Sequence, residues 1–382
     1  MKDFLNKPIE EDLDISLLNI DDKVRSNLFT WRGQFSPQFI EELLSAYADK
    51  DHVIFDPFLG SGTILVESAH FGLSAYGTEL NPAAVGLAKI YELINVEPHQ
   101  RETIVKSVEN IVDSKPNLER LVSITKESKA YEAIVTEALI IGLDLYHKEY
   151  SIDRLNKAWE QLKSTIKSLP FSTSEVRCFN SDAREVPLSD DFVDLVITSP
   201  PYINVFNYHQ NYRKSAEAIG YNVLNVAKSE IGANRKFRGN RYLTVIQYCI
   251  DIAMVFNELR RVCKDSAKVI FIVGRESTVK KTRFFNSALL TKVAELAGFK
   301  VVGNQERYFT NKFGQKIYED ILRFEIGEPT ITEEQLISGA REIGISQLKG
   351  ADTIAPEESK NDLEMAIIKG VDVSPSVILK EI

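Results

Sequence analysis

The feature that most constrains this chain is a glycine-rich turn between an apolar run and a helical run. His52-Val53-Ile54-Phe55-Asp56 is typical of a short buried strand, and Gly60-Ser61-Gly62 follows it closely. A helical stretch then runs from about Thr63 to Phe71, and Gly72 is a typical helix end. Glycine tolerates the positive φ angles and the close contacts that a turn beneath a ligand requires. The pattern therefore predicts a ligand-binding turn at the carboxyl end of a parallel strand.

A second strand and two carboxylates extend this pattern. Ser74 to Glu79 has the composition of a strand, and Pro82 suits the first turn of the helix that follows. This βαβα order favours a parallel sheet with right-handed crossovers. Glu79 ends its strand, where a carboxylate can accept hydrogen bonds from both hydroxyls of a ribose. Asp182 follows the third strand, Val176 to Phe179, where a side chain can reach an adenine edge.

The turn differs from the two common nucleotide-binding motifs. No Lys follows the glycines, which excludes a phosphate loop of the Walker type, and the spacing is not that of the usual dinucleotide fingerprint. A glycine pair alone is weak evidence, because any tight turn between a strand and a helix can contain one. The combination with a second strand and its terminal carboxylate favours a nucleoside cofactor.

A second motif, Thr198-Ser199-Pro200-Pro201-Tyr202, ends the buried strand Phe192 to Thr198. The two prolines fix φ and remove two N–H donors, so the turn is stiff and its carbonyls are free to accept hydrogen bonds. The Ser199 hydroxyl is a further acceptor, and Tyr202 offers a flat face on which a base can stack, worth about 1–3 kcal/mol. Alone, such a turn is equally an ordinary rigid turn. Its position downstream of a cofactor-type turn in the same sheet favours an amine-binding site.

The two motifs together predict methyl transfer from S-adenosyl-L-methionine to an exocyclic amine of a base. The lone pair of such an amine is delocalised into the ring. Acceptors at Ser199 and at the Pro200 carbonyl can draw its hydrogens out of the ring plane and localise the lone pair. Attack is then an in-line displacement helped by positioning, without a covalent intermediate. A base within a duplex cannot reach such a pocket and has to be flipped out.

The predicted fold is an α/β, Rossmann-like methyltransferase fold. We expect a mostly parallel sheet of seven strands with a final antiparallel hairpin and a helical insertion. The later elements are predicted as a helix from Tyr242 to Val262, a strand from Lys268 to Val273, a helix from Phe284 to Ala297, and two strands, Lys300 to Phe309 and Ile317 to Ile326, with Gly314 between them.

Four segments are predicted along the 382 residues, of which 44% are hydrophobic and can form a sizeable core. Residues 1–95 hold the N-terminal segment and the first half of the core. Residues 96–171 form the helical insertion, in which stripes such as Ile134, Ala138, Ile141 and Leu145 lie on one helix face. Residues 172–326 hold the second half of the core, with a basic loop at 203–241. Residues 327–382 form an acidic appendage, either helical or partly disordered.

Charge is distributed unevenly over a chain whose net charge is −9. Residues 203–245 contain seven Lys or Arg and two Asp or Glu, residues 275–316 nine and three, and residues 327–382 five and eleven. One such run is usually a solvated surface, but two basic runs after the second motif favour a nucleic-acid face. The candidate nucleic-acid contacts are Arg213, Lys214, Arg235, Lys236, Arg238 and Arg241, interleaved with Tyr208, Tyr212 and Phe237.

Three cysteines, Cys178, Cys249 and Cys263, lie far apart and lack metal-ligand spacing, so no metal site is predicted and a reducing compartment is expected. The N-terminus is too charged for a signal peptide, and no apolar run is long enough to span a membrane. The sequence therefore predicts a cytoplasmic protein without a membrane partner.

These motifs resemble those of the DNA amino-methyltransferases, the family that methylates N4 of cytosine or N6 of adenine. The resemblance covers about Phe29 to Ile326 and includes Gly33 to Pro37 with the helix Phe39 to Tyr47, Gly77 to Pro82, and Ser181 to Ala183. It implies a cofactor site formed by Phe35, Ser36, Pro37, Asp56, Pro57, Phe58, Gly60, Ser61, Gly62, Thr63, Glu79, Leu80, Asn81, Asp182, Ala183 and Thr198. It implies a catalytic turn formed by Ser199, Pro200, Pro201 and Tyr202.

The resemblance further implies S-adenosyl-L-methionine as cofactor, double-stranded DNA as substrate, and a restriction or defence-system partner. Serine before Pro-Pro-Tyr is more usual in N4-cytosine enzymes, although adenine enzymes also carry it. The chain departs from many members with this motif style because its cofactor motif precedes its catalytic motif. It also has no long separate target-recognition domain, so recognition falls to the insertion, to the basic loop or to a partner.

Several other functions remain open. A tRNA methyltransferase acting on N2 of guanine has the same fold with an Asp-Pro-Pro-Tyr-like turn, and a protein glutamine methyltransferase usually has Asn at that position. Methylation at C5 of cytosine needs a nucleophilic cysteine, and none of the three cysteines follows a proline. A catalytically idle DNA-binding subunit is a further alternative, against which the intact acceptor and cofactor motifs argue.

Overall fold

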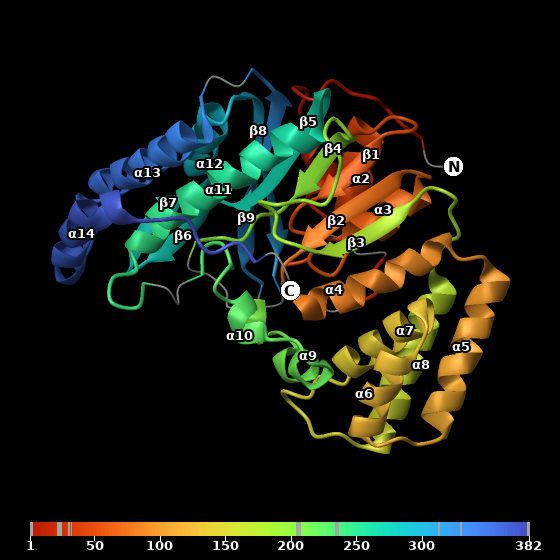
Figure 1. Ribbon diagram of the computed structural model, residues 1–382. Coiled ribbons are helices and arrows are strands. Elements are labelled where there is room, and N and C mark those ends of the chain that lie inside the picture. The colour runs from red at the N-terminus through yellow and green to blue at the C-terminus, as the bar shows by residue number, and fades with distance from the viewer. Residues whose placement is uncertain are drawn as a thin grey trace.

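A seven-stranded sheet forms the centre of the computed structural model, which describes residues 3–20, 25–29, 31, 33–203, 208–233, 237–311, 314–328 and 331–379 (Figure 1). The strand order is β3-β2-β1-β4-β5-β9-β8. These strands are β1 (Val53–Asp56), β2 (Ser74–Glu79), β3 (Val176–Asn180), β4 (Val193–Thr198), β5 (Cys263–Gly274), β8 (Phe299–Thr310) and β9 (Lys316–Ile326). The pairs β3–β2, β2–β1, β1–β4 and β4–β5 are parallel, and β9 is antiparallel to both β5 and β8. The predicted sheet and its final hairpin are confirmed.

Alternation along the strands divides the core into two layers. Ile54 packs in one apolar cluster and its neighbour Phe55 in the other. Leu195 and Val196 divide in the same way on β4. Successive side chains of a strand point to opposite faces, so a sheet covered on both faces needs apolar residues at nearly every position. This explains the continuous apolar runs of the central strands.

Helices cover both faces of the sheet (Figure 1). The helices before the insertion are α1 (Ile15–Leu18), α2 (Pro37–Tyr47), α3 (Thr63–His70) and α4 (Pro82–Ala88), followed by the 3₁₀ helix η1 (Lys89–Asn95). The later ones are η2 (Tyr208–Gln210), α9 (Arg213–Ile219), α10 (Val223–Val226), α11 (Leu243–Val262) and α12 (Asn286–Leu296). Helices α2 and α3 pack on one face, and α11 and α12 pack on the other.

The segment expected to be helical contains four helices after η1 and before β3, and they project from one end of the sheet (Figure 1). They are α5 (Pro98–Asp113), α6 (Leu118–Glu127), α7 (Ala130–Gly142) and α8 (Ile152–Ser168). The buried guanidinium of Arg101 donates to the carbonyl of Val96, where the chain enters this segment. It also donates to the carbonyls of Leu169 and Pro170, where the chain leaves it. One side chain therefore joins both ends of the insertion.

The acidic segment after residue 327 is helical over most of its length. It forms α13 (Glu333–Gly350), α14 (Glu357–Lys369) and the 3₁₀ helix η3 (Gly370–Asp372). A capping box between Thr332 and Gln335 begins α13, which packs along α11 (Figure 1). Leu336 and Ala340 of α13 are buried there. This buried contact explains why the segment is ordered despite its charge.

A second, two-stranded sheet was not expected from the sequence. It consists of β6 (Glu276–Val279) and β7 (Thr282–Phe285), joined by Lys280 and Lys281. Both lysines have positive φ, 48° and 65°, as a two-residue hairpin turn requires. Asn or Gly normally marks such a turn, so a Lys-Lys pair gave no signal. The predicted helix from Phe284 therefore begins two residues later, at Asn286.

Candidate active site

The two sequence motifs lie side by side at one edge of the sheet. Strands β1 and β4 are parallel neighbours, with Phe55 opposite Val196. The Thr198 hydroxyl donates a 2.6 Å hydrogen bond to Oδ1 of Asp56 in the buried region. The ends of the two strands are thus tied together directly before each motif begins.

The glycine-rich turn is held against the end of β2. Gly60 and Gly62 have φ of 54° and 90°, in the region that favours glycine, and Gly62 is the N-cap of α3. The Gly60 amide donates to Oε2 of Glu79 at 2.9 Å, and the Asn81 amide donates to Oε1 at 2.7 Å. Glu79 therefore fixes the turn, and each of its oxygens retains a further acceptor site.

A cavity of about 520 Å³ opens between the two motifs. Fifteen predicted site residues line it: Phe35, Ser36, Asp56, Pro57, Phe58, Gly60, Thr63, Glu79, Leu80, Asn81, Asp182, Ala183, Ser199, Pro201 and Tyr202. Pro37, Ser61, Gly62, Thr198 and Pro200 do not line it and belong to the elements behind these residues. Other lining residues were not predicted: Trp31, Gln34, Ser229, Glu230, Ile231, Gly274, Arg307, Phe309, Ile317 and Glu319. They come from four separate stretches of the chain, which only the fold brings together.

Burial shifts the protonation of two carboxyl groups in this cavity. Burial raises the pKa of Asp56 to about 7, although hydrogen bonds from Thr198 and from the Phe58 amide partly oppose the shift. Burial likewise raises the pKa of Glu79 to about 7, against the hydrogen bonds from the Asn81 and Gly60 amides. A cationic ligand would favour the ionised form of both groups.

Asp182 is paired rather than free. Its Oδ1 accepts from Nε of Arg184 at 2.8 Å, and its Oδ2 accepts from Nη2 at 2.6 Å. Arg184 also donates to Oδ1 of Asp251 on α11 and to the hydroxyl of Ser376 near the C-terminus. The side chains of Arg184 and Asp251 are fully buried. No local pattern in the sequence indicates that the C-terminal segment supports this wall of the cavity.

A buried histidine holds another carboxylate at the cavity wall. Nδ1 of His209 lies 2.8 Å from Oε2 of Glu230, and the His209 amide donates to Oε1 at 2.6 Å. This pair joins the segment after the second motif to the segment before α11. Arg307 is paired with Glu319 across the β8–β9 hairpin in a similar way, with Nε 2.8 Å from Oε2.

The cavity offers unused acceptors and donors to a ligand. The hydroxyl oxygens of Ser36 and Ser229 are buried, and no hydrogen-bond partner for them exists among the described residues. Both serines line the cavity together with the ionisable Asp56 and Glu79. S-adenosyl-L-methionine carries hydroxyl, amine and carboxylate groups and a net positive charge, so these residues fit it.

The acceptor turn is packed from two sides. A Cβ atom placed on Gly274, at the end of β5, would lie 2.9 Å from the Tyr202 ring. A Cβ on Gly232 would lie 2.8 Å from the Tyr202 carbonyl oxygen. Both close approaches need glycine and hold Tyr202 at the cavity mouth. Within the described part of the chain, no side-chain hydrogen bond occupies the Ser199 hydroxyl.

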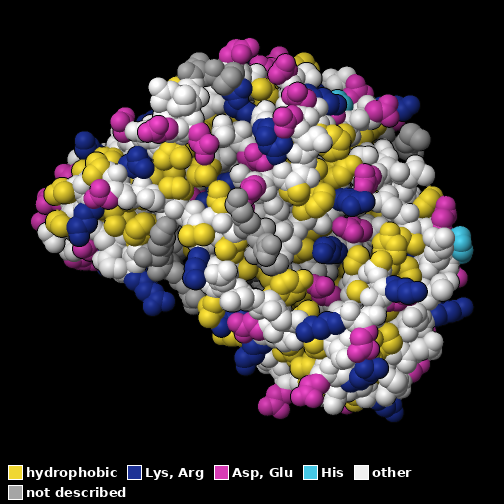
Figure 2. Space-filling view, viewed as in Figure 1, with side chains coloured by type: hydrophobic (Ala, Val, Ile, Leu, Met, Phe, Trp, Pro, Cys, Tyr) yellow, Lys and Arg dark blue, Asp and Glu magenta, His cyan; other side chains and the backbone are white. Residues whose placement is uncertain are grey.

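The predicted nucleic-acid contacts do not form one patch. Arg213 and Lys214 lie on α9 beside the insertion, where Arg213 is paired with Glu217 and Lys214 lies over the Tyr146 ring. Arg238 and Arg241 are exposed near α14, to which Asn240 is hydrogen-bonded. Arg235 and Lys236 lie outside the described residues. Figure 2 shows basic and acidic side chains interspersed over this face of the molecule, without one continuous basic area.

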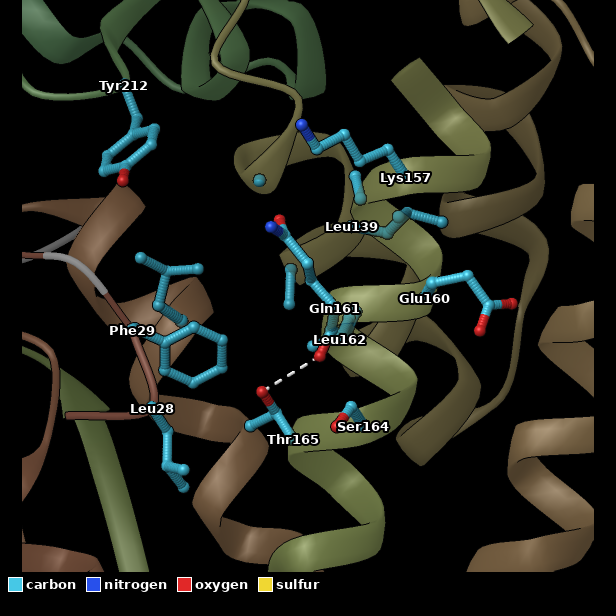
Figure 3. A pocket seen from close by; sticks show the side chains of 14 residues that line it. Leu28, Phe29, Leu139, Lys157, Glu160, Gln161, Leu162, Ser164, Thr165 and Tyr212 are labelled. Atoms are coloured by element: carbon cyan, nitrogen blue, oxygen red, sulfur yellow. Dashed lines mark hydrogen bonds between the residues drawn. The ribbon is translucent and has the colours of Figure 1, made fainter. Parts of the chain in front are cut away.

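A second cavity, of about 780 Å³, lies between the insertion and the N-terminal segment (Figure 3). Lys157, Gln161 and Thr165 of α8 line it on one side, and Phe29 and Tyr212 line it on the other. None of the predicted cofactor or catalytic residues lines it. The Tyr212 ring stacks on Trp31, with centroids 6.2 Å apart, and Trp31 lines the first cavity. The aromatic pair therefore lies between the two cavities.

Two further features of the described residues bear on other functions. No group of three or more His, Cys, Asp or Glu side chains is placed to hold a metal ion within that part of the chain. No helix there is long and apolar enough to cross a membrane.

Parts of the chain are similar to known methyltransferases. The type II methyltransferase M.AvaI of Nostoc sp. is 22% identical over 257 residues, covering 50% of this chain and 53% of the relative. The chain thus spans about half the length of this relative. The bovine tRNA (guanine(10)-N(2))-methyltransferase TRMT11 is 49% identical over 41 residues, 10% of this chain and 9% of the relative.

Among solved structures, a SAM-dependent methyltransferase from Methanosarcina mazei superposes with a TM-score of 0.36 at 12% identity, over 73% of this chain and 94% of that chain. Residues 5–89 match the family model described as DNA methylase, which spans β1, the glycine-rich turn and β2. The match supports the predicted S-adenosyl-L-methionine cofactor. Over this match, and over part of the type II relatives, the chain is similar to the DNA methylases of the N6/N4 family.

Proposed function

We propose that this chain transfers a methyl group from S-adenosyl-L-methionine to the exocyclic amine of a base flipped out of DNA. The observation that carries the proposal is the hydrogen bond between Asp56 and Thr198, which places the glycine-rich turn and the Ser-Pro-Pro-Tyr turn on one cavity. A cofactor site alone would suit any methyltransferase. The adjoining turn of carbonyl and hydroxyl acceptors selects an amine as the methyl acceptor.

The cofactor residues would form hydrogen bonds to S-adenosyl-L-methionine and would stabilise its positive charge. Glu79 would accept from the ribose hydroxyls, and Ser36 and Ser229 would supply the hydrogen bonds that their buried hydroxyls lack within the described chain. Asp182, held by Arg184, would face the adenine edge. When bound, the cofactor supplies an electrophilic methyl group carried on a sulfonium. The ionised Asp56 and Glu79 would favour that positive charge in the buried cavity.

The acceptor residues would bind and orient the amine. The Ser199 hydroxyl, which lines the cavity, would accept a hydrogen bond from one N–H group of the amine. The carbonyl of Pro200, which lies behind the lining residues, would accept a hydrogen bond from the other, and the two bonds would localise the lone pair for in-line attack. Tyr202 would stack on the flipped base from the cavity mouth. Ser199 favours cytosine N4 over adenine N6 as the acceptor, following the family preference. We also propose a cytoplasmic location, and a restriction partner is in keeping with the type II designation of the relatives.

A tRNA guanine-N2 methyltransferase is the second candidate, and the short match to TRMT11 favours it specifically. Incubation with tritiated S-adenosyl-L-methionine and either duplex DNA or tRNA separates the two. Label in DNA, located by sequencing and identified by digestion to nucleosides, supports the proposal. Label in tRNA alone would replace it with the second candidate. Absence of label from both, with the cofactor still bound, would leave an idle binding subunit.

A further inference from the structure

The β8–β9 hairpin presents two different faces beside the candidate site. Paired residues of an antiparallel ladder share a face, and successive residues alternate. Arg307, Phe309, Ile317 and Glu319 form the face that lines the cavity. The opposite face carries Tyr308 paired with Tyr318, and Thr310 paired with Lys316. This outer face has no part in the cofactor site described above.

On the outer face, two neighbouring aromatic rings are flanked by two cations. Nζ of Lys316 lies 4.0 Å from the centroid of the Tyr308 ring, and that ring lies 6.0 Å from the Tyr318 ring. The guanidinium of Arg275 lies 4.7 Å from the centroid of Tyr318. We name these four residues, Lys316, Tyr308, Tyr318 and Arg275, the cation–aromatic ladder. Contact with a ring holds a long basic side chain in one position at the surface and so reduces the entropy lost when it binds a ligand.

The ladder adjoins the acceptor turn through the backbone. Arg275 directly follows Gly274, whose Cα faces the Tyr202 ring. The Arg275 amide also donates to the Tyr318 carbonyl at 3.1 Å, which fixes the hairpin beside the end of β5. A base stacked on Tyr202 would therefore have its own strand passing close to Arg275.

We infer that the cation–aromatic ladder binds phosphates of the nucleic-acid strand that carries the acceptor base. This inference rests on the proposed function. Lys316 is exposed and Tyr318 is 38% exposed. The two cations, Lys316 and Arg275, each lie over an aromatic ring rather than in the core. Guanidinium and ammonium groups are the usual partners of phosphate oxygens, and such contacts fix the strand without reading its sequence.

One acidic residue competes with a phosphate on this face. The carboxylate of Glu306 is paired with the Arg275 guanidinium, and about half of its side chain is exposed. A phosphate would have to replace this carboxylate. Removing the charge at Glu306 should therefore strengthen binding, a gain that a purely structural role of the ladder does not predict.

The test measures binding of the full chain to a methylatable DNA duplex over a range of salt concentrations. Lys316→Ala should weaken binding severalfold and reduce the slope of log affinity against log salt by about 0.9, the value for one phosphate contact. Glu306→Gln should strengthen binding and steepen the slope. Lys281→Ala is the matched control, because Lys281 is an exposed hairpin lysine paired with Glu358. Affinity for S-adenosyl-L-methionine should be unchanged in all three variants.

The inference is overturned if wild-type chain methylates DNA while Lys316→Ala and Glu306→Gln bind it with wild-type affinity and slope. That result would assign the ladder to another partner, such as an acidic protein surface. Absence of methyl transfer to DNA by the wild type is a different outcome, because it contradicts the proposed function itself. DNA binding by the variants therefore tests the ladder, whereas methyl transfer by the wild type tests the proposed function.

Discussion

Thr198 and Asp56 are joined by a 2.6 Å hydrogen bond between the last residues of β4 and β1. Both side chains are buried. Thr198→Val keeps the shape of the side chain but removes the donor, so Asp56 retains only the Phe58 amide on that oxygen. A buried acceptor that loses a partner costs about 1–3 kcal/mol. We expect the free energy of unfolding in urea to fall by this amount, with weaker cofactor binding.

Thr125→Val is the control for this substitution. Thr125 is also buried and its hydroxyl donates to a carbonyl of its own helix, but it lies in the insertion. We expect its cofactor affinity to remain that of the wild type. Equal loss of cofactor affinity in both variants would show that Thr198 acts only through stability.

Cofactor affinity should depend on pH because burial raises the pKa of both Asp56 and Glu79 to about 7. The cationic cofactor binds the ionised carboxylates better, so its dissociation constant should rise as pH falls from about 8 to 6. Binding should release protons, which calorimetry in buffers of different ionisation enthalpy detects. Glu79→Gln should bind weakly at pH 8 and show a flatter pH profile. Glu92→Gln alters a buried carboxylate that accepts from the Cys178 amide outside the cavity, and its profile should match the wild type.

The same two groups give a signed prediction for the stability of the unliganded chain. Their pKa values are raised on folding, so the folded protein holds these protons more tightly than the unfolded chain. The contribution of these two groups to the free energy of unfolding is fully present below about pH 4 and is lost as pH rises through about 7. Relative to wild type, Asp56→Asn should therefore gain stability as pH increases over this interval. Parallel denaturation curves for the two proteins at all pH values would contradict the shift.

The packing of Gly274 against Tyr202 predicts that substitutions at either residue lower the rate of methyl transfer without changing the affinity for the cofactor. Gly274→Ala places a Cβ 2.9 Å from the ring, which must move. Tyr202→Ala removes the ring and its stacking, worth about 1–3 kcal/mol, or roughly 5- to 150-fold in base binding. Both variants should lower methyl transfer and keep cofactor affinity. Gly142→Ala, where no atom lies within 4 Å, should leave transfer at the wild-type rate.

Arg184 is expected to be essential for stability. Arg184→Met leaves the buried carboxylates of Asp182 and Asp251 without their shared partner. Breaking a buried pair in this way costs about 3–5 kcal/mol, measured as the free energy of unfolding. Ser376→Ala removes one of the hydrogen bonds to the same guanidinium and should cost less, about 1 kcal/mol. A loss below 1 kcal/mol in Arg184→Met would refute the role assigned to this network.

The central strands and the two motifs were predictable because local signals specify them. Continuous apolar runs such as Phe192 to Ile197 mark strands buried on both faces, and Gly60, Gly62 and the prolines mark the turns that follow. The final antiparallel hairpin was also predicted from its two strand-like runs and Gly314, whose φ is 78°. The signals that predict these elements come from residues that are close together in the chain.

Other parts of the site depend on contacts that no local pattern reports. Trp31, Glu230 and Arg307 reach the cavity from three distant segments, and their sequence surroundings are unremarkable. The pairing of Asp182 with Arg184 was not predicted, since a charged pair two residues apart on a loop has the pattern of a solvated turn. Of the predicted basic face, Arg213 and Lys214 lie on α9 beside the insertion, whereas Arg238 and Arg241 lie in the loop before α11 and near α14.

The join at Arg101 has a consequence for how such a protein can change. One guanidinium ties the entry of the insertion to its exit, and the insertion also packs on the core through Ile141, which lies against Gly86 of α4. A segment of another length could therefore replace it without disturbing the neighbouring strands only if it kept both of these attachments. We expect a graft that retains Arg101 and the contact with α4 to fold, and a graft that lacks either of them to destabilise the sheet.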